Sequence, residues 1–323
     1  MEIGIGSRRI ITVNHAQDPH RPSSRPSVFD ICVVGHVTKD IVRVGHTTTT
    51  KPGGTAYYTA VASRSLGLKV AVVTKGAPSD RDPLFKELEA NKVAVLERVG
   101  ESTSIFENTY GEEDLSARTQ VLKSMGTPFV RRDVEGIGAK AFHLGPLVKS
   151  DIPLEVLEQI SPEAEIVSLD VQGMVRPPRL GQVAEQDWLD KKTWLKFVHI
   201  LKADELEALV LSGEKDMGHA AAFLYSLGPR EVVITLGSRG SVVLADGKVH
   251  DIPSFPPRNL KDPTGCGDTY MAGYLYKRLK GSSPDRAGRF AAAMSTLKLE
   301  GTGPFKGTEE DVVARLSSSS KSL

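Results

Sequence analysis

A glycine-rich turn at residues 264–268, with the sequence TGCGD, has the residue types and the spacing that could do chemistry. Met271 and Leu275 follow it at helical spacing, so the turn is predicted to open directly into a helix. Such a turn aims backbone N–H groups and the positive end of the helix dipole at one point, which favours an anion. Asp268, in the first helical turn, would place a carboxylate there and could accept a proton. The simpler alternative is a glycine-rich loop with an N-capping aspartate.

A second glycine turn lies near the N-terminal end of the sequence. Gly53 and Gly54 precede a predicted helix that runs through Tyr58, and glycine lets backbone approach a ligand closely. Asp40 comes just after a predicted strand, where open α/β sheets place their ligands. Its alternative role is that of an ordinary cap or turn residue.

Two further patterns join late elements of the sequence. Gly237 and Gly240 lie in a turn between two strands that is too short for the crossover of a parallel pair, which predicts antiparallel pairing. Asp204 and Glu207 have the spacing of a capping box at the start of a helix. Because capping alone explains this pair, a functional role for it stays open.

Several common catalytic motifs are missing from the sequence. It contains no G-x-x-x-x-G-K-[ST], no H-E-x-x-H, no G-x-S-x-G and no cysteine cluster. An anion cradle with an adjacent acid, together with the two other glycine turns, suits phosphoryl transfer to an alcohol. That reaction needs positioning, neutralisation of the moving phosphoryl charge and a base for the hydroxyl proton.

The elements that must position these residues alternate between strand and helix from Phe29 onward, which predicts an α/β fold with a parallel sheet between helices. Extended segments at 37–50 and about 100–125 interrupt the alternation and predict a flap or small second sheet, unless the second is an ordinary surface hairpin. Residues 1–27, rich in Arg, Pro and Ser, are predicted to be a flexible extension, with organelle targeting as the alternative. Further predictions are a helix at 187–194, a strand at 197–201, a domain over 28–316 and a polar tail at 317–323.

Composition limits the function classes. The chain has 323 residues and a formal net charge of +1, so neither nucleic-acid nor membrane-surface binding is indicated. No apolar run is long enough to span a bilayer. The two cysteines, Cys32 and Cys266, lie far apart and indicate no disulfide framework and no zinc site. A cytoplasmic location is therefore expected.

The three glycine turns, taken in order, resemble the signatures of the ribokinase-like (PfkB) carbohydrate kinases over about residues 29–316. The most specific block is Asp262-x-Thr264-Gly265-x-Gly267-Asp268. The resemblance implies a mostly parallel β-sheet flanked by helices, with a small β lid over the acceptor site. It implies an ATP- and Mg²⁺-dependent kinase that phosphorylates a hydroxyl of a sugar, cyclitol or nucleoside. K⁺ dependence and a homodimer through the lid are left open.

The resemblance also implies site roles. Asp268 would be the general base, and the N–H groups of Gly265, Cys266 and Gly267 would form the anion hole. Asp170 and Arg176 resemble a family pair that follows a central strand. The remaining implied roles are acceptor binding by Asp40, Gly53, Gly54, Tyr58 and Asp268, ATP binding by Thr235, Gly237, Gly240, Thr264, Gly265, Gly267, Ala292 and Ser295, and Mg²⁺ contact through water by Glu207 and more weakly Asp204.

The sequence departs from the family pattern at two places. Tyr57 and Tyr58 stand where ribokinases have a sugar-binding asparagine, so they are expected to narrow the pocket or stack on a ring. Cys266 replaces a small residue, and a helix N-terminus is expected to lower the pKa of its thiol, although no covalent role is predicted. A vitamin or pyrimidine kinase of the same fold, or a nucleotide-binding regulator without catalysis, are the alternatives.

Overall fold

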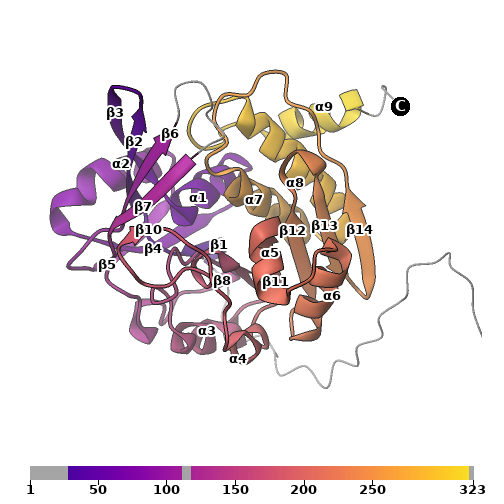
Figure 1. Cartoon of the computed structure of the whole chain (residues 1–323), viewed down its shortest axis with the longest axis horizontal. Helices are drawn as coiled ribbons and strands as arrows, with labels where there is room; N and C mark the ends of the chain where they lie inside the picture. Colours follow the sequence, from indigo (N-terminus) through magenta and orange to yellow (C-terminus); the bar gives the residue numbers. More distant parts are fainter. Residues whose placement is uncertain (1–27, 111–117, 320–323) are drawn as a thin grey trace, which may run out of the picture.

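The computed structural model describes residues 28–110 and 118–319 (Figure 1). The predicted extension at 1–27 and the last four residues of the predicted tail lie outside these ranges. So does the turn of the predicted hairpin near residue 111. No helix in the described ranges is long and apolar enough to cross a membrane.

Within these residues, nine strands form the central sheet, in the order β14-β13-β12-β11-β9-β8-β1-β4-β5. Neighbours from β12 to β5 pair in parallel, whereas β13 pairs antiparallel with both β12 and β14. The predicted α/β class and the predicted antiparallel pair are therefore confirmed. The strands are β1 (Phe29–Val34), β4 (Val70–Gly76), β5 (Ala94–Val99), β8 (Ala139–Leu144), β9 (Ile166–Asp170), β11 (Ile200–Asp204), β12 (Glu231–Thr235), β13 (Ser241–Ala245) and β14 (Lys248–Ile252).

Helices cover both faces of this sheet (Figure 1). Alternate residues of β1 point to opposite faces, so Ile31 and Val33 join one core and Cys32 and Val34 join the other. The first core contains α1 (Thr55–Ser65), α2 (Arg81–Ala90), α7 (Cys266–Leu279) and α8 (Pro284–Leu299), with α9 (Glu309–Ser319) packed on α8. The second contains α3 (Leu154–Ile160), α4 (Lys191–Leu195), α5 (Glu205–Ser212) and α6 (Met217–Ser226).

The predicted lid is confirmed as a second sheet with the strand order β10-β7-β6-β2-β3. Phe106 and Leu122 of this sheet pack on Leu147 and Val148, which lie after β8 in the main domain. This small apolar cluster joins the lid to the central sheet. The lid strands are β2 (Thr38–Val44), β3 (Thr47–Gly53), β6 (Ile105–Tyr110), β7 (Arg118–Ser124) and β10 (Gly181–Gln182).

The strand predicted at 197–201 is displaced, because β11 covers Ile200–Asp204. The N–H groups of Phe197 and Val198 donate to the carbonyls of Trp194 and Leu195, at 3.0 and 3.2 Å, and so continue the turn that ends α4. That helix is also shorter than predicted, since it begins only at residue 191. As a result Lys202 lies inside a buried strand rather than after it.

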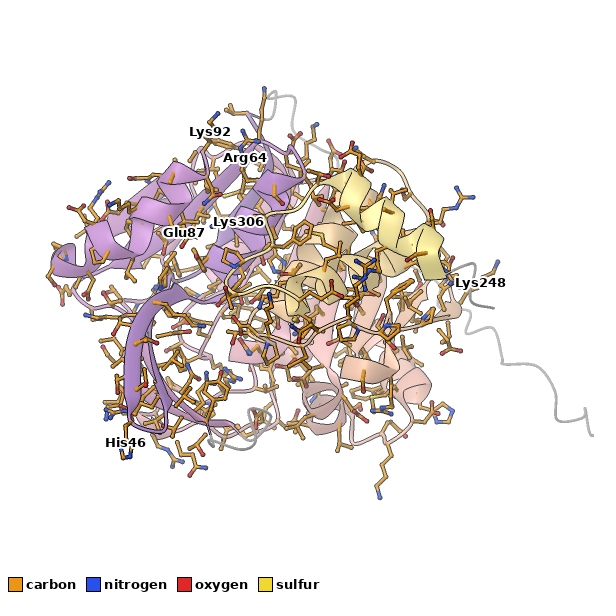
Figure 2. All side chains as sticks on the ribbon, turned by 90° about the horizontal axis from the view of Figure 1, so that it is seen from above. His46, Arg64, Glu87, Lys92, Lys248 and Lys306 are labelled. Carbon is orange, nitrogen blue, oxygen red and sulfur yellow. The ribbon has the colours of Figure 1, made fainter. Side chains whose placement is uncertain are left out.

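Three elements lack a sequence prediction: β10, β14 and α9. The helix α9 runs to Ser319, so the tail predicted from 317 begins inside it. Val312 buries one side of this helix in the core. Just before α9, Lys306 forms an ion pair with Glu87 of α2 at 2.7 Å, which ties this end of the chain to the N-terminal half (Figure 2).

Candidate active site

Asp268 borders a small polar cavity between the lid and the carboxyl-terminal ends of the central strands. The cavity has a volume of about 90 Å³. Open α/β sheets bind their ligands at this edge, because the loops there converge. The lining residues come from both sheets: Thr38, Asp40, Gly54, Thr55, Tyr58, Phe106, Gln120, Leu147, Gln172, Arg176, Thr264, Gly265 and Asp268.

The glycine-rich turn forms the N-terminus of α7 as predicted. Gly265 is the N-cap and has a left-handed φ of 79°, which favours glycine. A Cβ at Gly265 would lie 2.3 Å from Cδ1 of Tyr58, so the ring packs directly on this turn. Gly267 and Asp268 occupy the second and third helical positions, whose N–H groups have no intrahelical acceptor. These N–H groups are therefore suited to an anion.

Cys266 departs from its expected part in this turn. Its N–H donates to the carbonyl of Pro263 at 3.3 Å, so it is engaged within the loop. Its own carbonyl accepts a hydrogen bond from Ser295 Oγ of α8 at 2.8 Å. Burial raises the pKa of the thiol to about 12, which outweighs the effect expected of the helix N-terminus. The thiol is consequently protonated at neutral pH.

The carboxyl of Asp268 has a shifted pKa. Burial, aided by the negative charge of Asp170, raises this pKa to about 6, while Lys202 and Thr55 oppose the shift. The group is thus ionised at neutral pH and still basic enough to accept a proton. Position and basicity both fit a general base.

A buried cluster of charges lies beside the turn. Lys202 of β11 places Nζ 3.1 Å from Asp170 Oδ2 and 3.8 Å from Glu207 Oε2. A Cβ at Gly267 would lie only 3.3 Å from this Nζ, so the ammonium borders the N-terminus of α7. Burial alone would lower the pKa of Lys202, but Asp170, Glu207 and neighbouring carboxylates outweigh it and raise the pKa. The ammonium is therefore charged.

Asp204 and Glu207 form the predicted capping box at the start of α5. The Asp204 N–H donates to Glu207 Oε2 at 2.7 Å, and the Glu207 N–H donates to Asp204 Oδ1 at 2.8 Å. Burial raises the pKa of Glu207 to about 7, with Lys202 opposing the shift. The described residues hold no group of three acidic, His or Cys side chains that could enclose a metal.

Asp40 lies on the lid side of the cavity and is buried. Its Oδ1 accepts a hydrogen bond from Thr38 Oγ1 at 2.6 Å. Gly53 does not line the cavity, but a Cβ there would lie 2.2 Å from Asp40 Oδ2. The glycine thus leaves room for the aspartate, whereas Gly54 itself lines the cavity.

Only one of the two predicted tyrosines reaches the cavity. Tyr58 lines it, as expected. Tyr57 instead donates a hydrogen bond from its hydroxyl to Glu87 of α2 and does not narrow the pocket. The two residues are adjacent in a helix, so their side chains point in different directions.

Of the residues expected at ATP, Thr264 and Gly265 line the cavity and the others do not. Thr235 ends β12 and pairs with Asp204 in the sheet. Gly237 and Gly240 both have positive φ, and a Cβ at Gly240 would lie 2.0 Å from the carbonyl of Ile252. On α8, Ser295 contacts the glycine-rich turn through Cys266, and Ala292 is buried one turn earlier.

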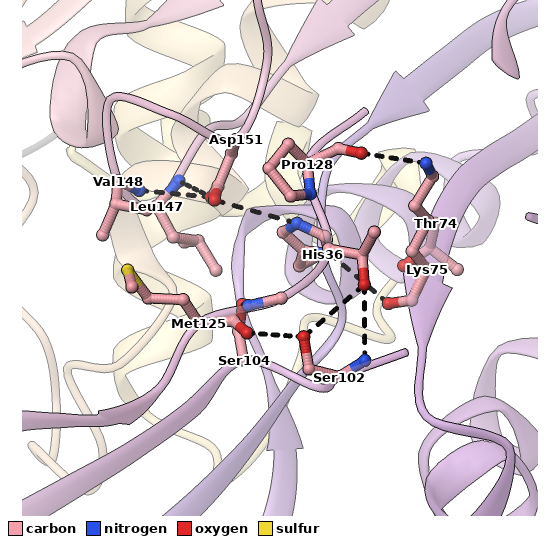
Figure 3. A network of polar contacts seen from close by, with 12 residues as sticks. His36, Thr74, Lys75, Ser102, Ser104, Met125, Pro128, Leu147, Val148 and Asp151 are labelled. Carbon is pink, nitrogen blue, oxygen red and sulfur yellow. Dashed lines mark hydrogen bonds and ion pairs between the residues drawn. The ribbon is translucent and has the colours of Figure 1, made fainter. Parts of the chain in front are cut away.

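A network of polar contacts after the end of β1 includes the loop that contains Leu147, a residue of the cavity lining (Figure 3). Asp151 Oδ2 accepts hydrogen bonds from the N–H groups of Leu147 and Val148, at 2.8 and 3.2 Å. His36 Nε2 lies 3.8 Å from Asp151 Oδ1. Lys75 Nζ donates to the carbonyl of Pro128 at 2.9 Å, in the segment that leaves the lid. These contacts hold the Leu147 loop and the base of the lid together.

Sequence reasoning missed several residues at this site. Lys202 could have been found as a charged residue in a buried strand, had the strand been placed correctly. Lys298 of α8, whose Nζ donates to the carbonyl of Asp262 at 2.6 Å, carries no sequence signal, because a lysine on a helix is ordinarily exposed. The cavity residues without a prediction are Thr38, Thr55, Phe106, Gln120, Leu147 and Gln172.

The fold, with its lid and its glycine turn at a helix N-terminus, is that of the ribokinase-like kinases. Residues 28–310 match the sequence model of the pfkB family carbohydrate kinases, and the chain belongs to this family.

This chain is similar to known kinases that differ in the acceptor named for them, as three examples show. A solved pyrophosphate-dependent kinase of the ribokinase family, complexed with a pyrophosphate analogue and myo-inositol, has 31% identity and a TM-score of 0.79, covering 88% of this chain and 99% of its own. Cytidine kinase of Thermococcus kodakarensis is 27% identical over 77% of this chain and 88% of its own length. The structure of Arabidopsis thaliana ribokinase with ribose and ATP has 21% identity and a TM-score of 0.71, covering 89% of this chain and 98% of its own. At this level of identity the similarity is one of fold alone.

Proposed function

We propose that this protein is a kinase that transfers a phosphoryl group from ATP to a hydroxyl of a small polyol, a sugar or a cyclitol. The observation that carries the proposal is the position of Asp268. Its carboxylate borders a polar cavity on one side and the free N–H groups of a helix N-terminus on the other. A base and an anion hole thus meet where a hydroxyl and a phosphoryl group would react.

In the proposed reaction, Asp268 accepts the proton of the acceptor hydroxyl as its oxygen attacks the terminal phosphorus of the donor. The N–H groups of Gly267 and Asp268, which have no intrahelical acceptor, stabilise the charge of the moving phosphoryl group, and the nearby Lys202 ammonium adds to this field. Mg²⁺, when bound with the donor phosphates, would neutralise part of their charge. Asp40 and Arg176, both at the cavity, would hold the other hydroxyls of the acceptor.

The lining of the cavity favours a polyol as the acceptor. Carboxylate, guanidinium, amide and hydroxyl groups make up most of it, and hydroxyl-rich rings can bond to all of these. Tyr58 offers a ring face on which the apolar side of a sugar or cyclitol can pack. Myo-inositol in the pyrophosphate-dependent relative supports a cyclitol in particular.

Pyrophosphate is the second candidate donor. The relative with 31% identity uses it. The buried Lys202 ammonium beside Gly267 also favours a compact, highly charged donor, since it supplies charge but no surface for a base. Both donors would present a phosphoanhydride bond to the anion hole. They differ in the leaving group, which is ADP for ATP and orthophosphate for pyrophosphate.

The proposal is tested by a screen of pentoses, hexoses, inositols and nucleosides with each donor separately. Release of ADP from ATP, or of orthophosphate from pyrophosphate, is measured together with formation of a phosphomonoester by ³¹P NMR. We expect acceptor-dependent turnover with a polyol. Absence of turnover with every pair would favour a nucleotide-binding regulator.

Replacement of Asp40 by asparagine is expected to raise KM for the acceptor by about tenfold or more, with a smaller change in kcat. A hydrogen bond to a charged group is worth about 1.5–3 kcal/mol, and Asp40 would bond to the acceptor in both the ground and the transition state. Steady-state kinetics with varied acceptor concentration measure the effect. Asp30→Asn is the control, since Asp30 pairs with Lys140 at the far end of β1. An unchanged KM in Asp40→Asn would remove Asp40 from the acceptor site.

A further inference from the structure

A second buried lysine lies behind the glycine-rich turn. The side chain of Lys298, on α8, is 0% exposed. Its Nζ donates to the carbonyl of Asp262 at 2.6 Å and lies 3.4 Å from Asp262 Oδ2. The same Nζ is 5.9 Å from the centroid of the Tyr58 ring, the ring that packs on Gly265. The ammonium is thus surrounded by a carbonyl oxygen, a carboxylate oxygen and an aromatic face.

Asp262 connects this ammonium to the turn. Its Oδ1 accepts a hydrogen bond from the Thr264 N–H at 2.9 Å, and its Oδ2 accepts one from the Gly303 N–H at 3.3 Å. Lys51 of the lid lies 3.7 Å from Oδ2, with its side chain 35% exposed. One carboxylate therefore fixes the entrance of the turn, the loop after α8 and the edge of the lid.

Burial of an ammonium is costly unless its charge is compensated, so Lys298 is not explained as a space-filling residue. Burial lowers the pKa of Lys298, and the charge and hydrogen bonding of Asp262 oppose this shift. Carbonyl and carboxylate oxygens are also the groups that bind alkali cations in proteins, as hard oxygen ligands. The ammonium occupies such an oxygen-lined position while remaining attached to the chain.

We propose that Lys298 is a built-in cation that holds residues 262–268 in their phosphate-binding conformation, so that the protein works without dissolved K⁺. This inference rests on the proposed function for its kinetic part alone. Lys298 acts through Asp262 and is a positioning residue. α8 thereby holds the turn at two points one helical turn apart, by Lys298 at Asp262 and by Ser295 at Cys266.

The first test compares the wild type, Lys298→Ala and Lys298→Met in chloride salts of K⁺, NH₄⁺, Na⁺ and choline at equal ionic strength. Wild-type kcat should be the same in K⁺ and in choline. Both variants should lose about 100-fold in kcat in choline, the cost of a displaced catalytic group. K⁺ or NH₄⁺ should raise the kcat of Lys298→Ala about tenfold, because the truncated side chain leaves a space for the ion. Neither ion should raise the kcat of Lys298→Met, in which the methionine side chain fills that space.

The second test needs no activity, so it separates this inference from the proposed function. NH₄⁺ or K⁺ should raise the Tm of Lys298→Ala by about 2 °C or more relative to choline, since an ion that binds only the folded state stabilises it. The Tm of the wild type and of Lys51→Ala, which removes the exposed lysine at the same carboxylate, should not respond.

Three results would overturn the proposal: stimulation of the wild type by K⁺, full kcat in Lys298→Met, or no ion-specific change in the Tm of Lys298→Ala. If the wild type is inactive with every donor and acceptor, the proposed function fails while the Tm measurements still decide the role of Lys298.

Discussion

Replacement of Asp268 by asparagine is expected to lower kcat by about 10²–10⁴-fold, the usual contribution of a general base. Asparagine keeps the shape of the side chain but cannot accept the hydroxyl proton. Donor binding at the N–H groups of the turn should survive, because these groups belong to the backbone. Steady-state kinetics and a donor-binding titration measure the two effects. Asp285→Asn is the matched control, since Asp285 is also an acid in the first turn of a helix but pairs with Arg289 on the surface.

The same carboxyl should set the acid limb of the pH profile. Burial raises the pKa of Asp268 to about 6, and only the ionised form can accept a proton. Wild-type kcat/KM should therefore fall tenfold per pH unit below about 6. A profile that stays flat down to pH 5 would show that another group is the base.

Stability gives an independent check on Asp268. Because the folded pKa lies above the unfolded value of 3.8, the folded state binds the proton more tightly, and its stability falls as pH rises from about 4 to about 6. Asparagine does not ionise, so Asp268→Asn avoids the cost of a buried charge at this position. Its free energy of unfolding at pH 7.5 should exceed that of the wild type by at most about 3 kcal/mol. Urea unfolding at pH 7.5 and 4.5 measures the difference, which should shrink at the lower pH.

Replacement of Lys202 by methionine is expected to destabilise the protein by about 3–5 kcal/mol at neutral pH. Methionine fills a similar volume but leaves Asp170, Glu207 and Asp268 without the ammonium that compensates their charge. Activity should fall as well, because the ammonium borders Gly267. Urea unfolding and steady-state kinetics follow the two losses.

The loss in Lys202→Met should depend on pH in a defined direction. Burial already raises the folded-state pKa values of Glu207 and Asp268, and without the ammonium that opposes this shift they rise further. The destabilisation is thus full above these raised pKa values and diminishes as pH falls toward 5. Lys306→Met, which removes an exposed ion pair with Glu87, should cost at most about 1 kcal/mol at any pH. A similar cost for both variants at pH 8 would contradict the role given to Lys202.

The fold could be predicted from the sequence because its signals are local. The buried strand β1 carries a short apolar run, Ile31–Val34, and the starts of α1 and α7 are marked by glycine turns. The lid was predictable for the same reason, except β10, whose two residues pair with β7 from a distant segment. The helix α9 was not, since most of its residues are charged or serine and only Val312 and Leu316, one turn apart, mark its apolar side.

The site was predictable only where glycine and acid patterns mark it. Asp268, Gly265 and Asp40 carry such patterns, and the structure gathers them at one cavity. The lysines do not, because Lys202 is separated from Asp170 by 32 positions and Lys298 from Asp262 by 36, and only folding brings each pair together. Pairings between distant elements are a property of topology and leave no trace in local spacing.

The most direct test of the account is ³¹P NMR of the wild type and Asp268→Asn, each incubated with a polyol acceptor and either ATP or pyrophosphate. A new phosphomonoester resonance, dependent on the acceptor, is expected with the wild type and essentially none with the variant. Equal phosphomonoester formation by Asp268→Asn, or none by the wild type with any acceptor and donor, would contradict it.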